Sequence, residues 1–150
     1  MKKLIAVSCF LLMGLSWQVG AFSEADLQKL KSSLKCPDCN LSGVDLSGAK
    51  LAGANLAYAN LDKARFFRAE LAGSKLTKAV LTEADLFSAD LTGADLSGAN
   101  LIDAYMEDAN LRDADLTGAD LSKAYLETTD LTGANLTQAN LTGAFLERTN

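Results

Sequence analysis

The chain has 150 residues, a formal net charge of −5 and no histidine, a length typical of one domain. Its serines and aspartates follow a repeat rather than the order of a catalytic triad, and its glycines lack the strand-to-helix setting of phosphate-binding loops. Composition therefore excludes the histidine-dependent and nucleotide-binding enzyme classes, and we expect a non-enzymatic protein without a cofactor.

Residues 1–21 differ from the rest of the chain. Two lysines precede an apolar run over residues 4–15, and small side chains occupy residues 19–21. This pattern predicts a secretory signal peptide that is cleaved after Ala21, with retention as an amphiphilic anchor as the alternative. We expect an exported protein, periplasmic or secreted, or lumenal in thylakoids if the organism is photosynthetic. Apart from the signal peptide, we expect no membrane contact.

A short helix is predicted over residues 23–34. Ser23 is a favourable N-cap residue and is followed three positions later by Asp26, and Leu27, Leu30 and Leu34 recur at helical spacing. A coiled β-structure downstream would expose an apolar end and unpaired strand edges. We therefore interpret this amphipathic helix as a plug for that end.

Two cysteines, Cys36 and Cys39, bound a CPDC segment after the predicted helix. A β-turn with proline in second place brings residues three apart to within about 7 Å, which permits a disulfide, and export favours the oxidised state. We favour a structural disulfide; a redox-active pair is the alternative, although no thioredoxin-type context follows. We expect no metal, because zinc would have only these two thiols and no histidine. Asn40 stands where haem attachment requires histidine.

From Leu41 to Leu146 a large apolar residue recurs at every fifth position. It is leucine except at Phe66 and Met106, and a small residue, usually alanine, stands two positions earlier. A period of five matches neither a helix nor a flat strand, so short extended pieces joined by corners must coil. Four such units would make a coil of about twenty residues, with successive coils about 4.8 Å apart.

The recurring pattern A(D/N)LXX, seen at residues 89–93 and 134–138, resembles the pentapeptide-repeat family. The resemblance covers residues 39–150 and implies an all-β fold, a right-handed quadrilateral parallel β-helix. Residues 22–38 would then form the capping helix and the CPDC junction. The family does not fix the function, since its members include DNA mimics that inhibit topoisomerases and many proteins without a known role.

One side of the predicted coil departs from the Asn, Asp, Ser, Thr and Gly of the other three. Its aromatic and acidic side chains should stack in columns about 5 Å apart. Exposed aromatic strips are typical of contact surfaces, although stacked rings also stabilise neighbouring coils, and solvated glutamates can splay apart. We interpret these residues as the candidate face for an unknown protein partner: Phe67, Phe87, Tyr105, Tyr125, Phe145, Glu107, Glu127 and Glu147.

Charge is divided along the repeat. Residues 41–80 hold six basic and three acidic side chains, whereas residues 81–150 hold three basic and thirteen acidic ones. Two classes of function remain: an exported structural or interaction module, and a DNA-mimicking inhibitor of a type II topoisomerase. Predicted export and the basic first coils favour the module, and we expect no nucleic-acid partner. No second helix is predicted after the repeat, so we also expect that the last coil could form a homodimer.

Overall fold

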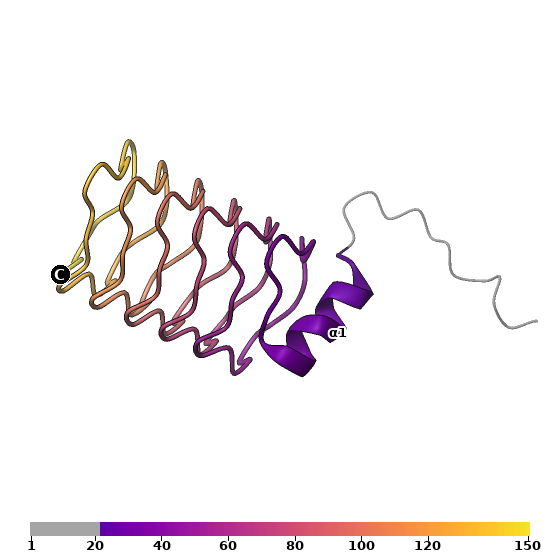
Figure 1. Cartoon of the computed structure of the whole chain (residues 1–150). Coiled ribbons are helices and arrows are strands. Elements are labelled where there is room, and N and C mark those ends of the chain that lie inside the picture. Colours follow the sequence, from indigo (N-terminus) through magenta and orange to yellow (C-terminus); the bar gives the residue numbers. More distant parts are fainter. Residues whose placement is uncertain (1–21) are drawn as a thin grey trace, which may run out of the picture.

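The computed structural model describes residues 22–150; the predicted signal peptide, residues 1–21, lies outside this range. Within the described range a single helix, α1 (Glu24–Ser33), leads into a solenoid of stacked coils, and α1 lies across the first coil (Figure 1). Over residues 22–150 no helix combines the length and apolar character needed to cross a membrane.

The coils are held together by parallel bridges between residues twenty positions apart. These bridges recur every five residues, from Lys35 with Asn55 to Tyr125 with Phe145. Each coil therefore has twenty residues and four bridging positions, as the period of five predicts. The stack is continuous: the N–H of Leu96, for example, donates to the carbonyl of Asp115 at 2.7 Å.

Each corner of a coil is a tight turn that begins at the inward leucine. The N–H of Ala99 donates to the carbonyl of Leu96 at 3.0 Å, and Gly98, the third residue of the turn, has φ 64°. A positive φ at this place is typical of type II turns and favours glycine. One coil earlier, however, Lys78 adopts φ 54°. The hydrogen bonds of the stack therefore impose the corner even without glycine.

We expected short extended strands between the corners, and the described residues contain isolated bridges instead. The reason is geometric. The turn from Leu96 to Ala99 uses four residues of a unit, which leaves Asn100 as the single residue between that turn and the next one. The β-structure of this protein therefore consists of single-residue bridges in ladders.

The core is a column of inward side chains. The large apolar residues from Leu41 to Leu126 are buried, including Phe66 and Met106, which are fully buried. Each buried side chain of this size contributes about 2 kcal/mol through removal of apolar surface from water. The inward side chains of the last coil are less buried, and Leu146 is 45% exposed.

Helix α1 covers the first coil. Leu27 and Leu30 belong to the buried core cluster, and the Oγ atom of Ser23 accepts a hydrogen bond from the N–H of Asp26 at 3.2 Å. The prediction that Leu34 continues the apolar face was wrong. Leu34 is the left-handed C-cap, with φ 55°, and is 37% exposed, because it turns the chain out of the helix and into the first coil.

Pairing between coils begins earlier than the predicted boundary at residue 39. Lys35 bridges to Asn55, and the N–H of Cys36 donates to the carbonyl of Asn55 at 2.7 Å. Both cysteines therefore belong to the first coil rather than to a separate junction.

Candidate functional site

The two cysteines form a disulfide beneath α1. Cys36 and Cys39 are bonded with their Cα atoms 5.4 Å apart, and both side chains are buried in the core cluster. Asp26 lies close enough that one oxygen and both sulfurs form a compact group. Two sulfurs bonded to each other carry no thiolate that could bind a metal. In the oxidised state the disulfide therefore closes the first corner covalently, and neither cysteine is a free metal ligand.

The eight residues predicted as a partner face lie on one side of the solenoid, which we call the aromatic–acidic face. Tyr105, Tyr125 and Phe145 bridge to one another in one ladder. The remaining five stand two positions after successive members of that ladder and so form the neighbouring column. They are Phe67, Phe87, Glu107, Glu127 and Glu147.

The rings of this face stack along the solenoid axis. Ring centroids are 4.9 Å apart between Tyr105 and Tyr125, 4.8 Å between Tyr125 and Phe145, and 5.9 Å between Phe67 and Phe87. At the same time Tyr105 is 43% and Phe145 47% exposed. The rings therefore stabilise adjacent coils and still present apolar surface to solvent, so the two interpretations of the aromatic strip are compatible.

Glu107, Glu127 and Glu147 form a column of like charges, and the first two carboxylates lie in an unfavourable electrostatic environment. Partial burial raises the pKa of Glu107; its own backbone N–H opposes this, and the charges of Glu127 and Asp85 add to the increase. The Oε2 atom of Glu127 is buried and has no hydrogen-bond partner among the described residues. Both observations indicate carboxylates that no cation of residues 22–150 neutralises.

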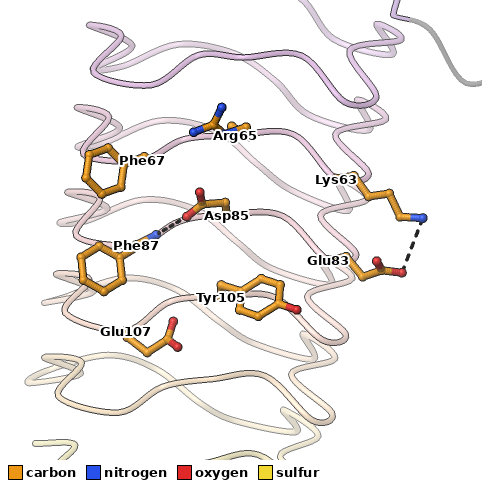
Figure 2. A pocket seen from close by; sticks show the side chains of 8 residues that line it. All are labelled: Lys63, Arg65, Phe67, Glu83, Asp85, Phe87, Tyr105 and Glu107. Carbon is orange, nitrogen blue, oxygen red and sulfur yellow. Dashed lines mark hydrogen bonds and ion pairs between the residues drawn. The ribbon is translucent and has the colours of Figure 1, made fainter.

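A groove of about 550 Å³ opens on the first half of the face (Figure 2). Figure 2 shows Phe67 and Phe87 along one side and Lys63 and Glu83 along the other. The groove is lined by Lys63, Arg65, Phe67, Glu83, Asp85, Phe87, Tyr105 and Glu107. The structure therefore gathers four of the predicted residues in the groove and leaves the other four, Tyr125, Glu127, Phe145 and Glu147, beyond it on the same face.

The basic side chains of the groove are already paired. Lys63 lies 3.6 Å from Glu83, and Arg65 lies 3.2 Å from Asp45, across neighbouring coils. Asp85 accepts a hydrogen bond from the N–H of Phe87 at 3.2 Å. Within residues 22–150 neither Asp85 nor Glu107 takes part in an ion pair. The charge left unmatched in the groove is therefore negative.

Sequence reasoning missed four lining residues as members of the site. Lys63 and Glu83 are the third residues of the turns that precede the aromatic–acidic face. Arg65 and Asp85 occupy the same ladder of bridges as Tyr105. The twenty-residue spacing was the available signal, because each pair shares a column. What the spacing did not show was which side chains would pair with one another.

These features define a class: a solenoid of five-residue units with one aromatic and acidic side. The sequence profile of a family described as pentapeptide repeats matches residues 38–66, 64–101, 94–133 and 129–150, with eight copies. The chain belongs to the pentapeptide repeat family.

Solved structures support this assignment. The chain is similar to a pentapeptide repeat protein (Rfr23) from the cyanobacterium Cyanothece 51142, with 31% identity, a TM-score of 0.67, and coverage of 84% of this chain and 94% of that one. It is also similar to QnrB1, a plasmid-mediated fluoroquinolone resistance protein, with 26% identity, a TM-score of 0.63, and coverage of 75% and 59%. A comparison with curated proteins gave no significant match. The family and the solved structures indicate no enzyme class.

Proposed function

We propose that the protein is an exported, non-enzymatic interaction module, a right-handed quadrilateral β-helix that presents its aromatic–acidic face to a protein partner. The observation that carries this proposal is the groove of about 550 Å³ on the side where the aromatic residues gather. Tyrosine and phenylalanine are enriched at protein interfaces, where they supply large contact areas. The other three sides carry mostly short polar side chains.

The stacked rings favour binding for a second reason. Tyr125 lies between Tyr105 and Phe145, with centroid distances below 5 Å on both sides. Side chains already ordered by their neighbours lose less conformational freedom when a partner binds. The face is therefore pre-organised for contact by the same stacking that stabilises the coils.

Export is supported by the disulfide. Structural disulfides form and persist mainly in oxidising compartments, and Cys36 and Cys39 are bonded to each other within the core cluster. The signal-peptide pattern of residues 1–21 agrees with this compartment.

Site-specific photo-crosslinking in the producing cells tests the contact face. The photoreactive analogue p-benzoylphenylalanine replaces Tyr105, and in a matched control it replaces Ala52, an exposed residue on the neighbouring side. We expect a discrete crosslinked product from position 105 and none from position 52. The same products from both positions, or none from position 105 of a folded protein, would contradict the proposal.

The alternative function is inhibition of a type II topoisomerase by imitation of DNA. Two observations favour it: the likeness to QnrB1, a fluoroquinolone resistance protein, and the thirteen acidic side chains of residues 81–150. The six basic side chains of residues 41–80 disfavour an evenly anionic mimic. Inhibition of gyrase supercoiling by the purified protein at near-stoichiometric amounts would support this alternative.

For assembly we propose a homodimer through the last coil. Leu131, Leu136 and Leu141 are only partly buried there, and exposed apolar ladders with free backbone edges favour association. Sedimentation equilibrium over a wide concentration range tests this, and a monomer throughout would contradict it.

A further inference from the structure

We propose that the groove binds an arginine side chain of the partner, between the carboxylates of Asp85 and Glu107 and the rings of Phe87 and Tyr105. This inference rests on the proposed function and specifies its chemistry. It follows from the way in which two successive coils place acids and rings opposite one another.

The four residues form a two-by-two arrangement. Asp85 bridges to Tyr105 in one ladder, and Phe87 precedes Glu107 by one coil in the next column. Tyr105 stacks on Tyr125 with one face, so its other face is directed toward Asp85. Phe87 is nearly parallel to Phe67, with ring centroids 5.9 Å apart, and Figure 2 shows its broad face turned toward the open side of the groove, with Glu107 beside its edge. In each column a ring and a carboxylate are therefore neighbours across the same two coils, and all four side chains line the groove (Figure 2).

Charge complementarity selects a cation for this space. Lys63 and Arg65 already pair with Glu83 and Asp45, whereas Asp85 and Glu107 form no ion pair within the described part of the chain. The raised pKa of Glu107, which burial causes first and nearby carboxylates increase, agrees with an environment that a bound cation would relieve.

Arginine fits this arrangement better than lysine does. Its planar guanidinium donates in several directions, can bond two carboxylates at once, stacks on aromatic rings and is weakly hydrated. The protein itself contains such a contact, since the guanidinium carbon of Arg68 lies 5.0 Å from the ring centroid of Phe67. A volume of about 550 Å³ also leaves room for residues on either side of the arginine.

A peptide titration followed by NMR tests the inference on the protein as purified from the producing cells. The probe is the capped peptide Gly-Ser-Arg-Ser-Gly, and the matched peptides carry citrulline or lysine in place of arginine. We expect saturable shifts at the amides of Asp85, Phe87, Tyr105 and Glu107 with the arginine peptide, and weaker binding by at least about tenfold with citrulline, which keeps the shape and removes the charge. Equal binding of citrulline or lysine would overturn the inference.

Variants of the protein provide a second test of the arginine site. The double variant Asp85→Asn with Glu107→Gln should weaken arginine-peptide binding by at least about tenfold. Its fold should persist, because Asn100 occupies a bridging position and accepts the equivalent hydrogen bond from Ile102 at 3.1 Å.

The matched control is Asp115→Asn with Glu70→Gln, which removes the same charge outside the groove. It should bind like the unmodified protein, and an equal loss in the control would overturn the inference.

The two proposals fail separately. If the arginine peptide does not bind but Tyr105 still gives a discrete crosslink, the arginine subsite is wrong and the contact face stands. If the crosslink is absent while the peptide binds in the groove, the subsite stands and the partner face is wrong.

Discussion

The carboxylate of Asp26 accepts the backbone N–H of Asn40 at 2.9 Å, and this bond fastens α1 to the first coil. The N–H of Ser23 donates to the carbonyl of Asn40 at 2.8 Å, so the same residue of the coil holds the helix start twice. The acidic side chain three positions after the N-cap residue thus makes a tertiary contact with the first coil.

Replacement of Asp26 by alanine should therefore loosen the cap. We expect Asp26→Ala to lower the free energy of unfolding by about 1–2 kcal/mol, because a charge-assisted hydrogen bond is lost. Glu24→Ala is the control: this first-turn acid bonds only Gln28 within the helix, and its loss should cost about 0.5 kcal/mol or less. Urea unfolding measures both, and equal losses would show that Asp26 acts only through the helix dipole.

The disulfide should stabilise the chain by a modest amount. For so small a loop we expect Cys39→Ala to lower the free energy of unfolding by about 2 kcal/mol in oxidising buffer. Alanine is the matched replacement because Ala59 and Ala79 follow in the same inward column. The difference should nearly vanish when reductant is added to both proteins. A loss that persists under reductant would mean that the packing of Cys39, rather than the bond, matters.

The buried column of inward apolar side chains should not tolerate a charged residue. Leu96 is fully buried, and Leu96→Lys should destabilise the protein by more than about 4 kcal/mol, because it buries an unpaired cation and removes apolar contacts. Ala72→Lys is the control, since Arg112 already occupies the same outward column two coils later. Thermal unfolding followed by circular dichroism compares them, and an unchanged midpoint for Leu96→Lys would contradict the inward assignment.

Glu107 should make stability depend on pH. Its pKa is raised, chiefly by partial burial, so the ionised form is disfavoured in the folded state. The contribution of Glu107 to stability is therefore fully present below the ordinary pKa of glutamate and is lost as pH rises through the raised value. Glu107→Gln should remove this loss and increase stability at neutral pH, with no gain in acid.

The control for this prediction is Glu147→Gln, in the exposed last coil of the same column, which should change stability little. Urea unfolding between acid and neutral pH distinguishes the two variants. A gain for Glu107→Gln that is equally large in acid would contradict the electrostatic explanation.

The sequence predicted the coil because the period of five leaves few choices. Every leucine at that spacing must face inward, and the stacking of Phe67 on Phe87 follows once a coil has twenty residues. The exposure of Leu34 was not predictable from spacing, because the left-handed cap depends on how the helix meets the first coil. The groove was likewise missed, since the pairing of Lys63 with Glu83 depends on side-chain conformations.

The central claim is that the chain works outside the cytoplasm as an interaction module, and fractionation of a C-terminally tagged chain with intact mass on the recovered protein tests it most directly. We predict an extracytoplasmic species that begins at Phe22 and is lighter than its reduced form by two hydrogen atoms. An uncleaved, reduced chain in the cytoplasm would contradict the account and make topoisomerase inhibition the leading function.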